Sequence, residues 1–188
     1  IITNYGIYDD GEVHTDAFQS LIDTVANNGG GVIIVPEGTY ITGALFFKKN
    51  VHLYIAENGI LLGSNDISDY PLCETRIEGE TCTYYPALIN ADNIDGFHVL
   101  GKGTIDGNGL KSWKAFWLRL KWNPNCTNKD EQRPRLIYLS NCSNAVISGL
   151  KLQNSHFWTT HFYKCHNVRI LNCNIFSPAS PTPAPSTD

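Results

Sequence analysis

The feature that most constrains this chain is a repeat of 23 residues near its C-terminal end. Asn144-Ala145-Val146-Ile147 and Asn167-Val168-Arg169-Ile170 match at this offset. The same offset pairs three further positions, Cys142 with Cys165, Leu150 with Cys173, and Leu152 with Ile175. A period in the twenties with short strands is typical of a solenoid, in which each repeat contacts only its neighbours.

The repeat extends toward the N-terminus with longer spacings. Asn93-Ile94 precedes Asn144 by 51 residues, and Asn50-Val51 precedes Asn93 by 43 residues. The sequence places the additional length in two polar insertions, residues 64–86 and residues 107–134. We therefore expect similar coils that carry long loops at these two places.

The repeats predict an all-β fold. They are too short for helical solenoids, and they lack the leucine spacing of leucine-rich repeats. Strands of about four residues, with glycine and asparagine at the corners, predict a parallel β-helix whose coils stack about 4.8 Å apart. An apolar run at residues 31–36 reads as a first buried strand.

A stack of this kind exposes unpaired backbone at its ends, so a cap is expected. Apolar residues at helical spacing predict a capping helix over residues 15–27, with Thr15 as its N-cap. Residues 177–188 contain four prolines and are predicted to connect to a next coil that is missing. We therefore expect residues 1–188 to form one truncated β-helix domain.

Composition excludes several partners and indicates a compartment. A net charge of −4 gives no global basic field for nucleic acid, and no apolar run approaches the length that spans a membrane. The chain contains no methionine, which indicates a processed or cut N-terminus, and its six cysteines are compatible with an oxidising compartment. We expect a secreted or periplasmic protein that contacts neither nucleic acid nor membrane.

Five stretches in a fixed order make the chain recognisable. They are residues 29–40 (GGGVIIVPEGTY), 101–109 (GKGTIDGNG), 133–137 (RPRLI), 154–159 (NSHFWT) and 185–188 (PSTD). Together they resemble the polygalacturonase family of glycoside hydrolases, family 28, whose fold is a right-handed parallel β-helix. The resemblance implies hydrolysis of α-glycosidic bonds in galacturonate-containing pectin with inversion. It implies no cofactor and no metal.

The resemblance also implies one catalytic residue. The catalytic set of the family begins with Asn-Thr-Asp and continues with Asp-Asp, Gly-His-Gly and Arg-x-Lys. Ser186-Thr187-Asp188 matches the first motif with Ser186 in place of Asn, which points to Asp188, and the later motifs do not occur in these residues. Because inverting hydrolysis needs both an acid and a base, we expect this chain to be inactive alone.

Four residues near the end of the repeat form a predicted substrate surface. The 23-residue register places His161 over Tyr138 and Trp158 over Arg135 on the outer face of the coils. We predict that Arg135, Trp158 and His161 bind a sugar ring and its carboxylate. The alternative is that these aromatic side chains only cover the wall.

The second insertion contains a predicted amphipathic helix over residues 111–121. Trp113, Phe116, Trp117 and Leu120 recur at helical spacing. The opposite face carries four cations and no acid: Lys111, Lys114, Arg119 and Lys121. This face is either a basic wall beside a groove for a polyanion or an ordinary solvated surface, and the pattern favours the second.

Five of the six cysteines divide into two groups, and Cys126 has no assigned partner. Three of them are expected to point inward as small stacked hydrophobic residues: Cys142, Cys165 and Cys173. Cys73 and Cys82 share the first insertion, and a disulfide between them is predicted.

Two functions without catalysis remain open. One is a β-helix that only binds acidic glycan, and the other is a structural β-helix such as those of adhesins or phage fibres. The hydrolase interpretation predicts a full-length monomer whose partner is pectin or polygalacturonate.

Overall fold

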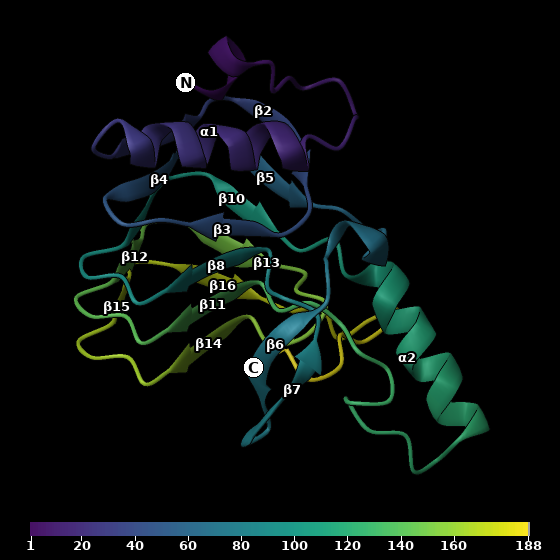
Figure 1. Ribbon diagram of the computed structural model, residues 1–188. Coiled ribbons are helices and arrows are strands. Elements are labelled where there is room, and N and C mark those ends of the chain that lie inside the picture. The colour runs from purple at the N-terminus through teal and green to yellow at the C-terminus, as the bar shows by residue number, and fades with distance from the viewer. Residues whose placement is uncertain (188) are drawn as a thin grey trace.

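The computed structural model describes residues 1–187, which form a right-handed parallel β-helix (Figure 1). Three parallel sheets, which we call walls 1, 2 and 3, surround one apolar core. Wall 1 comprises β1 (Gly31–Val35), β4 (Val51–Ile55), β9 (His98–Gly101), β12 (Val146–Ser148) and β15 (Arg169–Leu171). Wall 2 comprises β2 (Gly38–Thr42), β5 (Gly59–Gly63), β10 (Thr104–Asp106), β13 (Lys151–Gln153) and β16 (Asn174–Phe176). Wall 3 comprises β3 (Leu45–Phe47), β8 (Ile89–Asp92), β11 (Ile137–Ser140) and β14 (Thr160–Tyr163).

Each strand turns alternate side chains into the core. In β4, Val51, Leu53 and Ile55 are fully buried and the residues between them reach the surface. The strand predicted at residues 31–36 is confirmed as β1, and it follows the same rule: Ile33 and Val35 are buried, whereas the residues that alternate with them are not. Val32 is 55% exposed, because side chains on neighbouring positions of a strand point to opposite faces.

The 23-residue register is confirmed in all three walls. Val146 pairs with Arg169, Leu152 with Ile175, and Tyr138 with His161. The predicted alignments of the earlier coils are wrong. Val99 pairs with Ile147 and Leu53 pairs with Val99, offsets of 48 and 46 rather than 51 and 43.

The wrong alignment arises because asparagine occurs at more than one corner of a coil. Asn50, Gly96, Asn144 and Asn167 occupy one column of corners, and all four have positive φ. Asn93 belongs to a neighbouring column with Asn141, where φ is also positive. Because asparagine tolerates the left-handed region, it recurs at more than one corner, and the sequence alone matched the wrong one.

Helix α1 (Thr15–Asn27) lies across the N-terminal end of the stack, below the short helix η1 (Ile2–Tyr5) (Figure 1). Its buried face inserts Phe18, Leu21 and Ile22 into the core. The predicted N-cap is wrong by one residue, since His14 holds that position without a side-chain cap. Thr15 instead accepts a hydrogen bond from the Gly43 amide at 2.7 Å, which ties the helix to the first coil.

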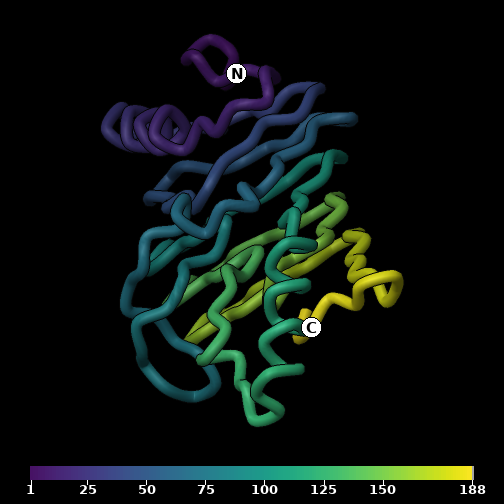
Figure 2. Tube along the Cα trace, turned by 90° about the vertical axis from the view of Figure 1, so that its right-hand side faces the viewer, coloured from purple at the N-terminus to yellow at the C-terminus, as the bar shows by residue number. Residues whose placement is uncertain are grey.

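Every long insertion lies between a wall 2 strand and the next wall 3 strand. The first contains η2 (Ile67–Asp69) and an antiparallel hairpin of β6 (Cys73–Ile77) and β7 (Glu80–Tyr84). The second contains α2 (Leu110–Trp122), which confirms the predicted helix and runs along the side of the stack next to residues 177–187 (Figure 2). Wall 3 is therefore bordered along one edge by long loops. Neither α1 nor α2 is long and apolar enough to span a bilayer, and the same holds for every helix in residues 1–187.

Several apolar side chains of the last coil are exposed to solvent. Ile175 continues the column of Leu152, yet Ile175 is 51% exposed whereas Leu152 is fully buried. Phe176 and Leu171 are 50% and 43% exposed. Within residues 1–187, no further strand pairs with β14, β15 or β16.

Candidate active-site wall

Residues 177–187 bring the chain back from wall 2 to wall 3. The indole Nε1 of Trp117 donates to the carbonyl of Pro183 at 2.7 Å. The hydroxyl of Thr159 donates to the carbonyl of Thr187 at 2.6 Å. Thr187 therefore lies beside the start of β14, at the edge of wall 3. The predicted catalytic residue, Asp188, follows it in the chain and lies outside the described residues.

Tyr138 and His161 stack on the outer face of wall 3, as the register predicts. Their ring centroids are 5.0 Å apart. The neighbouring residues Leu139 and Phe162 pack into the core, which leaves Tyr138 and His161 on the opposite face. Trp158 meets His161 edge to face with centroids 4.8 Å apart, so an aromatic surface covers this end of wall 3.

Arg135 lies at the same place but is not open to solvent. Its side chain is only 1% exposed. The guanidinium donates to the Thr75 hydroxyl at 2.7 Å, to the Arg76 carbonyl at 3.1 Å and to Nδ1 of His161 at 2.8 Å. It also lies 4.0 Å from the centre of the Tyr138 ring. The hairpin β6–β7 covers Arg135, so in this arrangement a sugar carboxylate does not reach it directly.

The contact with Arg135 fixes the protonation of His161. A guanidinium can only donate, so Nδ1 of His161 must accept and the proton of the neutral ring must sit on Nε2. Burial, and then the nearby charge of Arg135, lower the pKa of His161 to about 4. His161 is therefore a neutral hydrogen-bond donor at its Nε2 atom near neutral pH.

A groove of about 390 Å³ runs over wall 3 beside the hairpin. Its lining includes Glu74, Asn90, Asp92 and Tyr138. Cys73 also lines it, and the predicted disulfide between Cys73 and Cys82 is wrong because both are free. In the hairpin Cys73 faces Tyr84 and Cys82 faces Thr75, so the two cysteines are diagonal neighbours. Diagonal side chains lie farther apart than a disulfide can bridge.

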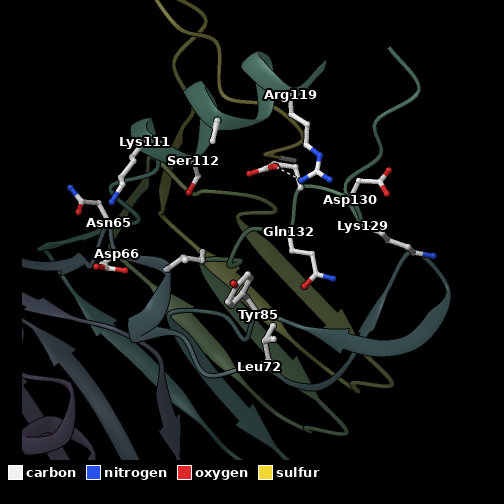
Figure 3. Close-up of a pocket in the computed structure, with 13 residues that line it drawn as sticks. Asn65, Asp66, Leu72, Tyr85, Lys111, Ser112, Arg119, Lys129, Asp130 and Gln132 are labelled. Atoms are coloured by element: carbon white, nitrogen blue, oxygen red, sulfur yellow. Dashed lines mark hydrogen bonds and ion pairs between the residues drawn. The ribbon is translucent and has the colours of Figure 1, made fainter. Parts of the chain in front are cut away.

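A second cavity of about 430 Å³ lies between α2, residues 129–132 and the residues that flank the hairpin, Leu72 and Tyr85 (Figure 3). Its cations are largely neutralised. Arg119 pairs with Glu131 at 3.0 Å and Lys129 pairs with Glu80 at 2.6 Å. Lys111 points toward Asp66 in Figure 3 and lowers the pKa of that carboxyl, although the amide and hydroxyl of Ser68 contribute more. This cavity is therefore not a strongly basic site, and the exposed lysines of α2 stay compatible with an ordinary solvated face.

The sequence did not single out a second buried network next to this cavity. The Arg133 side chain is 1% exposed, donates to the His156 carbonyl at 3.0 Å and lies 4.2 Å from the centre of the Phe116 ring. His156 shares a hydrogen bond of 2.7 Å with Ser112. Both residues occur in the stretches RPRLI and NSHFWT, but sequence cannot show that a loop and a helix will cover them.

The described residues contain no candidate metal-binding site. Within residues 1–187, no three histidine, cysteine or acidic side chains cluster closely enough to hold a metal ion.

The model of the glycosyl hydrolases family 28 matches residues 71–188, which is well over half of the chain. The chain belongs to glycosyl hydrolase family 28. The matched segment begins just before the hairpin and ends at Asp188, so it includes Arg135, Tyr138, Trp158 and His161.

Proteins named as polygalacturonases align along all or nearly all of the chain. A protein named "Probable polygalacturonase" from Vitis vinifera is 29% identical over 198 residues, which covers 100% of this chain and 38% of that protein. The chain thus spans about two fifths of the length of this relative. The structure of a family 28 exopolygalacturonase from Yersinia enterocolitica superimposes with a TM-score of 0.80 over 94% of this chain and 38% of that one, at 23% identity.

The fold alone does not distinguish an enzyme from a binding protein. PfbA, a surface adhesin of Streptococcus pneumoniae, shares the fold with a TM-score of 0.62 at 22% identity, over 96% of this chain and 38% of that one. Because one fold hosts many functions, the family membership and the residues of wall 3 must carry the functional argument.

Acid should destabilise this family 28 domain through His156. Burial lowers the pKa of His156 to about 4 from its usual 6.5. Because the unfolded chain binds a proton more readily, this contribution is complete above pH 6.5 and is lost as pH falls toward 4. A shift of this size corresponds to about 3 kcal/mol.

The measurement is the melting temperature of the full-length protein between pH 7 and pH 4.5, compared with H156Q. We expect a steeper fall in the wild type than in the variant. Parallel curves for the two proteins would show that His156 is not the group responsible.

Proposed function

We propose that this chain is the N-terminal part of a secreted or periplasmic family 28 enzyme that hydrolyses α-glycosidic bonds of galacturonate-containing pectin with inversion. The observation that carries the proposal is the family match, which runs through the Ser186-Thr187-Asp188 motif at its end. The contact between Thr159 and Thr187 supports it, because it brings Thr187 to the edge of wall 3, next to the strand that carries His161.

Asp188 supplies one of the two carboxyl groups that inversion requires. One group protonates the leaving oxygen, and the other activates a water molecule on the opposite face of the bond. The second carboxyl group comes from residues beyond Asp188, as the Asp-Asp motif of the family implies. The reaction needs no cofactor, and the whole protein works as a monomer on the polysaccharide.

The groove over wall 3 provides the binding surface. Tyr138 lines it and stacks on His161, which Trp158 meets edge to face, so these rings offer a surface on which a sugar can pack. Arg135 acts from behind this surface rather than as a direct ligand, because it is covered by the hairpin.

Residues 1–188 alone should release no reducing sugar from polygalacturonate, because a single carboxyl group cannot serve as both acid and base. The test compares this fragment with the full-length gene product in a reducing-sugar assay at equal concentrations. Activity of the fragment would contradict the assignment of the second carboxyl group to later residues. Inactivity of the full-length protein would contradict the proposed function itself.

A β-helix that binds acidic glycan without cleaving it is the second candidate, because the parallel β-helix fold is compatible with both functions. Affinity electrophoresis in polygalacturonate separates the two. The enzyme binds and degrades the polymer, whereas a binding module is retarded and leaves it intact. A purely structural β-helix shows neither effect.

A further inference from the structure

We propose that Arg135 and His161 form a carboxylate-selecting pair, in which buried Arg135 positions His161 so that its Nε2–H donates to the free carboxylate of a galacturonate unit. The pair thereby favours galacturonate over its methyl ester. This inference rests on the proposed function, since it assumes that the polymer lies along wall 3.

The first support is the unusual state of Arg135. Burying a charge is costly unless a partner of opposite charge compensates it. Arg135 is 1% exposed, and within residues 1–187 no carboxylate forms an ion pair with it. Its Nε atom is buried without a hydrogen-bond partner among these residues. The site therefore holds a positive charge that the described protein groups leave uncompensated.

The second support is the set of groups that contact the guanidinium of Arg135. Three of the groups around the guanidinium are neutral parts of the protein, namely the Thr75 hydroxyl, the Arg76 carbonyl and the Tyr138 ring. The fourth is Nδ1 of His161, which lies toward the surface of wall 3. His161 is half-buried, and its Nε2 atom has no partner among residues 1–187 and is not enclosed. The imidazole thus connects the buried cation to the surface.

The third support is the location of His161. It lies two residues after Thr159, whose hydroxyl binds the Thr187 carbonyl. The residue that precedes the proposed catalytic Asp188 in the chain is therefore held at the start of β14, the strand that carries His161. Trp158 flanks His161 and gives the sugar ring an apolar surface at the same place.

The chemistry distinguishes an acid from its ester. A carboxylate carries a full negative charge and accepts a charge-assisted hydrogen bond, which is stronger than a bond to a neutral carbonyl. The positive charge behind His161 polarises its Nε2–H and attracts the carboxylate further, whereas a methyl ester gains little from either effect. The charged and titratable groups that the described residues place against His161 are Arg135 and Tyr138, and no carboxylate is among them.

The test measures kcat and KM of the full-length enzyme on polygalacturonate and on partially methyl-esterified pectin. The variants are R135M, R135K and H161A. We expect R135M and H161A to lower kcat/KM on polygalacturonate about tenfold or more, the size expected for one lost charge-assisted hydrogen bond. The loss should appear mainly in KM and should be severalfold smaller on the esterified polymer. R135K retains the charge and should recover part of the preference.

R76M is the matched control, because it removes a nearby cation of the hairpin and keeps the backbone carbonyl that Arg135 contacts. It should change the preference less than twofold. Selective ¹⁵N-histidine spectra, in which H161A identifies the His161 signal, should show neutral His161 protonated at Nε2 and a raised pKa in R135M.

Each outcome has a separate meaning. Equal losses on both polymers in R135M and H161A would show that the pair is only structural and would overturn the inference. If R135M does not fold, H161A decides, and an unchanged preference in H161A overturns it as well. A wild-type enzyme that cleaves neither polymer contradicts the proposed function instead.

Discussion

Replacing Asp188 by Asn in the full-length protein should abolish most of the hydrolysis of polygalacturonate, with kcat lower by about a thousandfold. General acid or base catalysis by one positioned group contributes about 10² to 10⁴ in rate, and the amide can neither give nor take the proton. The KM should change much less, because the residues that contact the polymer remain. The measurement is reducing-sugar release under steady-state conditions.

D16N is the matched control for this substitution. Asp16 is an exposed residue of α1 at the N-terminal end of the stack, and the change removes the same charge. It should leave kcat within twofold of the wild type. A D188N enzyme with more than about a tenth of the wild-type kcat would exclude Asp188 as an essential acid or base.

Replacing Gly101 by Ala should destabilise the stack by about 4 kcal/mol or more, at the top of the range for single substitutions. Gly101 ends β9 with φ at 139°, and a Cβ atom there would overlap the Ile55 carbonyl oxygen. That oxygen accepts hydrogen bonds from Lys102 at 3.0 Å and Gly103 at 3.2 Å, so it cannot move without breaking the corner between two coils. The measurement is the melting temperature and soluble yield of the full-length protein.

G79A separates the effect of the clash from that of backbone strain. Gly79 also has positive φ, at 82°, but nothing lies within 4 Å of an added Cβ atom. Only the intrinsic cost of the left-handed conformation applies there, about 1 kcal/mol. If G101A and G79A lower the melting temperature equally, close packing of the coil corners is not what makes Gly101 necessary.

The coils without insertions were predictable because their sequence repeats directly. Leu152 and Ile175 occupy one core column, and the same side-chain chemistry recurs at the same offset. Where insertions interrupt the repeat, the alignment of one coil with the next depends only on the asparagines at the coil corners. Several corners require positive φ, so Asn93 was matched to the wrong column.

The candidate site was predictable only in its outer layer. Register alone placed His161 over Tyr138, since both lie on uninterrupted strands of wall 3. Sequence could not show that the hairpin folds back over Arg135, because that contact joins Thr75 and Arg135 across 60 residues. The hairpin covers Arg135, which is why we propose that it positions His161 and does not contact the polymer directly.

The same long-range contacts explain why the buried histidine was missed. His156 reads as a polar residue in a loop, yet Ser112 of α2 and the ring of Tyr70 enclose it. Its environment depends on contacts between two insertions that are far apart in the sequence. Local sequence patterns do not predict such long-range contacts.

The central claim is that the protein cleaves polygalacturonate by inverting hydrolysis, and the configuration of the first product tests it most directly. Proton NMR during the first turnovers of the full-length enzyme distinguishes the two anomers before they interconvert. Inversion at an α-glycosidic bond predicts that the new reducing end appears first as the β-anomer. Initial formation of the α-anomer, or of an unsaturated product from elimination, would contradict the account.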